Sequence, residues 1–137
     1  MADLPEIDLA APLQFVINAA AGSSDAEAKR EVVEAALRAG GRRGDLLFCS
    51  PAELTWVSEQ AATSAIATRT AVVAVGGDGT LNTVAQAAHG AGCAMGVVPQ
   101  GTFNYFARTH GIPPDPAEAA RLLLHAAPAR CVGHTDR

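Results

Sequence analysis

A glycine-rich pentapeptide, Gly76 to Thr80, combines residue types that can handle phosphate. Gly76, Gly77 and Gly79 permit positive φ and carry no side chain, so backbone N–H groups can approach an anion closely. We expect Thr80 to open a helix, whose N-terminus carries partial positive charge. Asp78 is the exception, because a carboxylate beside phosphate is repulsive unless it acts through Mg²⁺, accepts a proton or hydrogen-bonds a hydroxyl.

The pentapeptide differs from the two common nucleotide-binding fingerprints. No lysine follows the glycines as in G-x-x-x-x-G-K-[ST], and no G-x-G-x-x-G follows the first apolar run. Lys29 is the single lysine of the chain, and it falls in a predicted helix. We therefore expect the charge of a bound γ-phosphate to be met by backbone dipoles, Mg²⁺, an arginine or groups outside this chain.

Short apolar runs alternate with Ala-rich amphipathic stretches and predict the elements that position this pentapeptide. The apolar runs predict four strands, at 13–17, 46–49, 71–75 and 94–98. The amphipathic stretches predict helices at 25–39, 51–68, 81–88, 105–109 and 116–126. Gly44 and Asp45 are expected to form a turn before the second strand. Strand-then-helix units in this order predict a three-layer α/β/α fold, with a mainly parallel sheet covered on both faces.

Ligands of an open α/β sheet bind beyond the carboxyl ends of its strands. Three loops are expected at that edge: 18–24, 76–80 and 99–104. The first and third loops contain further small and polar residues, so we expect them to lie beside the pentapeptide at the ligand site.

Composition narrows the classes of partner. The chain has 137 residues, enough for one domain, and a net charge of −4, which argues against nucleic acid and against a polybasic membrane patch. Cys49, Cys93 and Cys131 form no CxxC pair, so a zinc site has little support, and we expect buried thiols in a reduced compartment. No apolar stretch reaches the roughly 20 residues that cross a bilayer. These features favour a cytoplasmic protein that touches membranes only transiently, at their surface.

Two segments resemble one family specifically. Residues 73–82, VAVGGDGTLN, resemble the GGDGTxN signature of the diacylglycerol kinase catalytic domain, whose core is shared with NAD kinases and 6-phosphofructokinase-like folds. Residues 98–108, VPQGTFNYFAR, are similar to the family segment P-x-G-T-x-N-D-F-A-R, and residues 17–23, INAAAGS, more weakly to its N-P-x-[SA]-G loop. The resemblance extends over about 13–127 and favours the bacterial lipid-kinase type, which is related to sphingosine kinases, over NAD kinases.

The resemblance implies an ATP- and Mg²⁺-dependent kinase that phosphorylates a lipid hydroxyl. It implies that Asp78 is the catalytic carboxylate, working with Mg²⁺ or with the acceptor hydroxyl. It also implies a nucleotide site made of Asn18, Gly22, Ser23, Ser50, Gly76, Gly77, Gly79, Thr80, Asn82, Gly101, Thr102 and Asn104.

Three positions depart from the family pattern. Ala19 replaces a proline, which should loosen the first loop slightly. Thr83 and Tyr105 stand where a Glu and an Asp are usual, so two carboxylates that could organise metal or an acceptor headgroup are missing. These departures leave the phosphate-binding role intact but put diacylglycerol itself in doubt as the acceptor.

The resemblance also implies a division of labour between domains. Residues 1–127 would form the nucleotide-binding domain, and 128–137 would begin a β-rich second domain that carries the acceptor site. We expect no efficient turnover from this chain alone, and an exposed sheet edge or helix face could make it a homodimer. Two alternatives stay open: a related kinase with a sphingoid base or an NAD-like acceptor, and a nucleotide-binding module without catalysis.

Some of these residues also have purely structural interpretations. Ser50, followed by Pro51 and Glu53, suits an ordinary helix cap, and Asn18 could be a simple strand end. Thr102 could likewise only cap a helix. Trp56 is expected to pack in the core or at an interface.

Overall fold

The computed structural model describes residues 10–20 and 22–99. Within them the elements are β1 (Leu13–Asn18), α1 (Ser24–Gly40), β2 (Gly44–Cys49), a 3₁₀ turn η1 (Pro51–Glu53), α2 (Leu54–Ala67), β3 (Val72–Gly76), α3 (Asp78–Ala91) and β4 (Met95–Pro99). The predicted helices at 105–109 and 116–126 lie outside the described residues.

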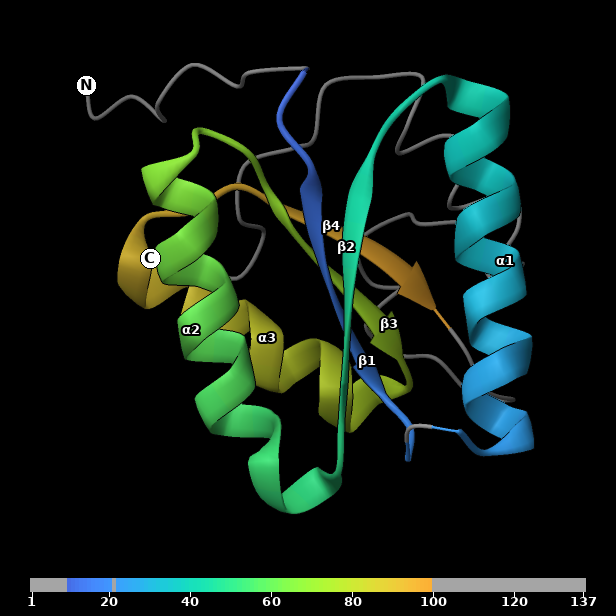
Figure 1. Ribbon diagram of the computed structural model, residues 1–137. Coiled ribbons are helices and arrows are strands. Elements are labelled where there is room, and N and C mark those ends of the chain that lie inside the picture. The colour runs from blue at the N-terminus through green and yellow to red at the C-terminus, as the bar shows by residue number, and fades with distance from the viewer. Residues whose placement is uncertain (1–9, 21, 100–137) are drawn as a thin grey trace.

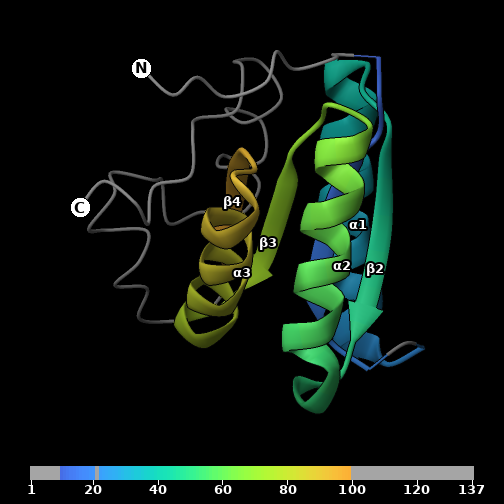
Figure 2. The same ribbon diagram turned by 90° about the vertical axis from the view of Figure 1, so that its left-hand side faces the viewer.

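The described strands form one parallel sheet in the order β2-β1-β3-β4 (Figure 1). Helix α1 covers one face of this sheet, and α2 and α3 lie side by side on the other (Figures 1 and 2). The chain therefore has the predicted three-layer α/β/α architecture with a parallel sheet.

Alternate strand residues point to opposite faces, and both faces are apolar. Leu13, Phe15 and Ile17 of β1 pack with Val33 and Leu37 of α1 in one buried cluster. The other face contributes a second cluster, formed with α2 and α3, whose buried sheet residues are Val16, Cys49, Val72, Ala74, Met95 and Val97. A sheet that is buried on both faces explains why its strands read as continuous apolar runs rather than alternations.

Buried residues follow helical spacing on the covering helices. In α3 they are Thr80, Leu81, Val84, Ala85 and Ala88, which form one stripe. Small alanines along α2 and α3 suit the close packing of these two helices on one sheet face. No helix within the described ranges is both long and apolar enough to span a membrane.

Two local predictions are wrong. Gly44 and Asp45 do not form a turn; they are the first residues of β2, where they pair with Leu13 and Gln14. Helix α3 begins at Asp78 rather than after Thr80, and it ends three residues later than predicted, at Ala91. The predicted glycine loop is therefore reduced to Gly77, which lies between the last residue of β3, Gly76, and the first residue of α3, Asp78.

Candidate functional site

The strand ends meet at one edge, as the sequence predicts. The register pairs Asn18 with Cys49 and Gly76 with Pro99, while Ile17 lies beside Val75. The first two predicted loops, and the start of the third, therefore leave the sheet at the same level. In Figure 1 this carboxyl edge faces down and to the right: β1 and β2 end at the bottom, and β3 ends at the lower right, where α3 begins.

Gly76 makes the turn into α3 possible. Its φ is +158°, and a Cβ added there would lie 2.9 Å from both Cβ and Oγ1 of Thr80. The Thr80 side chain therefore occupies the space that any side chain at position 76 would need. Of the three glycines, Gly76 alone uses the positive φ that glycine permits, because Gly77 has φ −87° and Gly79 is helical.

The N-terminus of α3 presents two backbone donors, the N–H groups of Gly79 and Thr80, that no described residue engages. Gly77 is its N-cap and has no side chain to cap it, and the first helical hydrogen bond runs from Leu81 N–H to Gly77 C=O over 2.9 Å. Within the described part of the chain, no group accepts a hydrogen bond from the N–H of Gly79 or Thr80. Such unpaired N–H groups, together with the helix dipole, are suited to an anion.

A hydrogen-bonded chain ties this helix start to β1 and α1. The side-chain amide of Asn18 donates to Thr80 Oγ1 over 3.1 Å. The ammonium of Lys29 in turn donates to the Asn18 carbonyl over 3.1 Å and forms an ion pair with Asp25 at 3.0 Å. Asn18 is therefore more than a simple strand end. Lys29 was not among the predicted site residues; its being the only lysine was the one sequence signal that could have pointed to it.

Asp78 is the first residue of α3 and is half-buried at the same edge. An acid in the first helical turn is favourable with the helix dipole on its own account. Among the described residues, no group of three or more His, Cys, Asp or Glu side chains could hold a metal ion. Since Mg²⁺ commonly binds one or two carboxylates together with substrate phosphates, one acid here fits a nucleotide-borne Mg²⁺ but not a metal held by protein alone.

Other predicted site residues at this edge have structural roles, in turns and helix caps. Gly22 has φ +84°, which favours glycine, and the Ser23 hydroxyl accepts from Ala26 N–H over 3.0 Å as the N-cap of α1. Ser50 donates to Glu53 Oε1 through its N–H at 3.0 Å and its hydroxyl at 3.1 Å. Asn82 is exposed on α3. Nucleotide contacts by these residues stay predictions.

The thiol beside Ser50 is not a candidate nucleophile. Burial, and secondarily the Glu53 carboxylate, raise the pKa of Cys49 above the ordinary 9.0. Cys49 and Cys93 are both buried free thiols, as predicted. Cys131 lies outside the described residues, as do the predicted nucleotide-site residues Gly101, Thr102 and Asn104.

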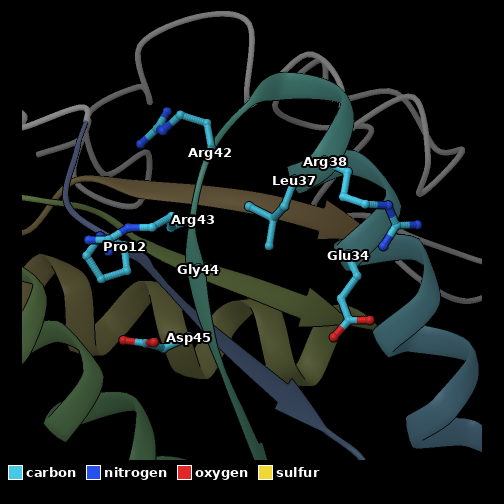
Figure 3. A pocket seen from close by; sticks show the side chains of 8 residues that line it. All are labelled: Pro12, Glu34, Leu37, Arg38, Arg42, Arg43, Gly44 and Asp45. Carbon is cyan, nitrogen blue, oxygen red and sulfur yellow. The ribbon is translucent and has the colours of Figure 1, made fainter.

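A hollow of about 610 Å³ lies at the opposite edge of the sheet (Figure 3). It is lined by Pro12, Glu34, Leu37, Arg38, Arg42, Arg43, Gly44 and Asp45. Figure 3 shows Arg38 and Arg42 pointing away from each other, and two acids share the wall with the arginines. Its place at the amino ends of β1 and β2, and its diverging charges, separate it from the candidate site.

Fold and site together define a parallel α/β domain with a glycine-bearing strand-to-helix turn at its carboxyl edge. Residues 12–131 match the family model for the diacylglycerol kinase catalytic domain. This chain therefore belongs to the diacylglycerol kinase catalytic domain family.

Relatives agree with this assignment. Over 106 residues the chain is 41% identical to a Pseudomonas aeruginosa protein called "Probable lipid kinase YegS-like", covering 71% of this chain and 33% of that protein. A protein of the same description from Klebsiella pneumoniae is 49% identical over 55 residues, 39% of this chain and 18% of that one. The chain thus spans about a third or less of these relatives. A diacylglycerol kinase structure from Bacillus anthracis has the same fold, with a TM-score of 0.67 and 24% identity over 83% of this chain and 43% of that one.

Proposed function

We propose that this chain supplies the ATP- and Mg²⁺-binding half of the active site of a lipid kinase. One observation supports this most: the N-terminus of α3 carries N–H groups, at Gly79 and Thr80, that no described residue uses. They lie where a parallel α/β sheet binds its ligands, and helix N-termini are common phosphate sites.

The residues around the start of α3 each have a part in the proposal. The N–H groups of α3 would hold phosphate oxygens, and Asn18 would keep the Thr80 side chain over Gly76. Asp78 would work with Mg²⁺, which supplies neutralisation of the phosphate charge. Catalysis would then rest on positioning and electrostatic stabilisation rather than on a protein nucleophile.

The acceptor is proposed to be a lipid hydroxyl. Membership of the family supports this class of acceptor, and the relatives are described as lipid kinases. Because the chain spans 33% of one such relative, we place the acceptor site in a region outside this chain and expect no efficient turnover without it. Such a kinase would work in the cytoplasm and meet its lipid transiently at the membrane surface.

Calorimetry on the 137-residue chain tests the nucleotide site. Mg-ADP should bind at least about ten-fold more tightly than adenosine, since the proposed contacts are to phosphates. Removing Mg²⁺ with EDTA should weaken ADP binding in the native chain, whereas the variant Asp78→Asn should lose most of this Mg²⁺ dependence. Equal binding of ADP and adenosine, or no binding at millimolar concentration, would reject the proposal.

A further inference from the structure

Lys29 is buried to an unusual degree for a lysine. Its side chain is 12% exposed, although lysine is among the residue types least often buried unless paired. Its charge is balanced by Asp25, whose carboxylate oxygen lies 3.0 Å from Lys29 Nζ. The Asp25 side chain is 62% exposed. A lysine held in this way loses hydration and side-chain conformational entropy. The group that it contacts therefore indicates its role.

The contact of Lys29 is the last carbonyl of β1. Asn18 pairs with Cys49 on the edge strand β2, and on the other side the ladder with β3 ends at Ile17. Lys29 Nζ donates to the Asn18 carbonyl at 3.1 Å, and hydrogen bonds to charged groups are stronger than neutral ones. The ammonium therefore fixes the backbone at the position from which the Asn18 side chain departs.

That side chain is the one that reaches α3. The Asn18 amide donates to Thr80 Oγ1 at 3.1 Å, and Thr80 fills the space over Gly76. A continuous set of contacts thus runs from α1 through the end of β1 to the helix start, where no described residue accepts from the N–H groups of Gly79 and Thr80. Its members come from three elements, and Lys29 is the one charged donor in it.

We propose that Lys29 is a positioning residue of the nucleotide site, acting through Asn18 on the N-terminus of α3. This inference rests on the proposed function, because it takes the nucleotide polyphosphate as the ligand of that helix start. It assigns a role to the single lysine of a chain whose glycine turn lacks the lysine of the common phosphate loop.

The first arm of the test needs no variant. With only one lysine in the chain, ¹⁵N-lysine labelling gives one side-chain ammonium signal. We expect this signal to show slowed proton exchange in the free protein and to shift on addition of Mg-ADP but not of adenosine. An ammonium that exchanges as fast as free lysine and ignores Mg-ADP would overturn the proposal.

The second arm compares variants by calorimetry with Mg-ADP. Lys29→Met should raise Kd by about ten-fold, in keeping with the loss of one charge-assisted hydrogen bond, and should leave adenosine binding unchanged. Lys29→Arg should recover part of the loss. The Asn18 side-chain amide signals should move in Lys29→Met even without nucleotide.

Matched controls separate positioning from bulk charge. Arg38→Met removes one positive charge from the far end of the same helix and should change Kd by less than about two-fold. Asp25→Asn leaves the hydrogen bond from Lys29 to Asn18 in place, so the Kd for Mg-ADP should also change by less than about two-fold. A pure charge effect instead predicts tighter binding, because one negative charge is removed. Equal losses in Lys29→Met and Arg38→Met would overturn the inference alone. A native chain that does not bind Mg-ADP at all would overturn the proposed function with it.

Discussion

The side-chain amide of Asn18 lies 3.1 Å from the hydroxyl of Thr80, and this hydrogen bond joins positions 62 residues apart. Thr80 is buried, and its side chain lies against the spot where a Cβ of residue 76 would stand. One hydroxyl therefore anchors the first turn of α3 to the end of the central strand β1. The shape of the glycine turn depends on this pairing rather than on the glycines alone.

The variant Thr80→Val tests the anchor. Valine keeps the shape and the β-branch but cannot accept the hydrogen bond, so we expect the free energy of unfolding to fall by about 1 kcal/mol. Thr80→Ser, which keeps the hydroxyl, should retain Mg-ADP affinity better than Thr80→Val. Urea denaturation and nucleotide titration measure the two effects. A valine variant with native stability and affinity would show that the hydrogen bond is dispensable.

Two glycines three residues apart should respond oppositely to alanine. Gly76→Ala places a Cβ 2.9 Å from Thr80 atoms at φ +158°, so we expect a loss of about 1–3 kcal/mol in thermal or urea unfolding. Gly79→Ala meets nothing within 4 Å inside a helix and should stabilise by up to about 1 kcal/mol. Equal stability of the two variants would contradict the claim that Thr80 fills the space over Gly76 while the space beside Gly79 is open.

The N-cap of α1 offers a matched pair of serines. Ser23 Oγ accepts from Ala26 N–H at 3.0 Å and donates to the Ala20 carbonyl at 2.7 Å. Ser23→Ala should therefore cost about 1 kcal/mol in unfolding free energy. Ser24→Ala, at the exposed first residue of the helix, should change it by less than about 0.5 kcal/mol. A similar cost at both positions would contradict the capping assignment.

Acid should weaken the start of η1 through Glu53. Hydrogen bonds from the Ser50 backbone N–H, and then from its hydroxyl, lower the pKa of Glu53 below the ordinary 4.5. A lowered pKa in the folded state contributes stability that is complete above pH 4.5 and is lost as pH falls through the folded value.

The variant Glu53→Gln keeps an acceptor but does not titrate. Urea midpoints taken from pH 7 to pH 3 should therefore converge for native protein and variant as the pH drops below 4.5. A difference between the two that stays constant over this range would show that Glu53 does not report the hydrogen bonds of Ser50.

Local sequence patterns were enough to predict the sheet. Apolar runs such as Ala71 to Val75 and the turn residues around them specify strands, and four such units leave little choice of topology. The register that brings Asn18 and Gly76 to one edge follows from parallel pairing. The structure confirms this architecture to within one or two residues at most strand ends.

The errors arise where local pattern and tertiary context compete. Gly44 and Asp45 resemble a turn, yet pairing with β1 draws them into β2. Glycine disfavours helix interiors, yet Gly79 lies within α3 because Leu81 and Val84 must face the core. Trp56 is 64% exposed, so the core placement expected for it is wrong, and the interface placement stays a prediction.

The candidate site was only partly predictable for a different reason. The glycines, Asp78 and Thr80 are contiguous and carry a recognisable signature. Lys29 and Asn18 are separated in sequence by a loop and the first turn of α1, and the fold brings them together. Their spacing in the sequence does not predict this contact. Which groups are already engaged, such as the Thr80 hydroxyl that accepts from Asn18, also depends on side-chain geometry that a sequence does not display.

Amide chemical shifts of the ¹⁵N-labelled chain, followed during titration with Mg-ADP, test the central claim most directly. The account predicts that the largest shifts belong to Gly79 and Thr80, with Asn18 and Gly76 next, and that adenosine leaves these signals in place. Shifts that instead centre on Arg42 and Arg43 at the opposite edge, or an absence of shifts at millimolar Mg-ADP, would contradict it.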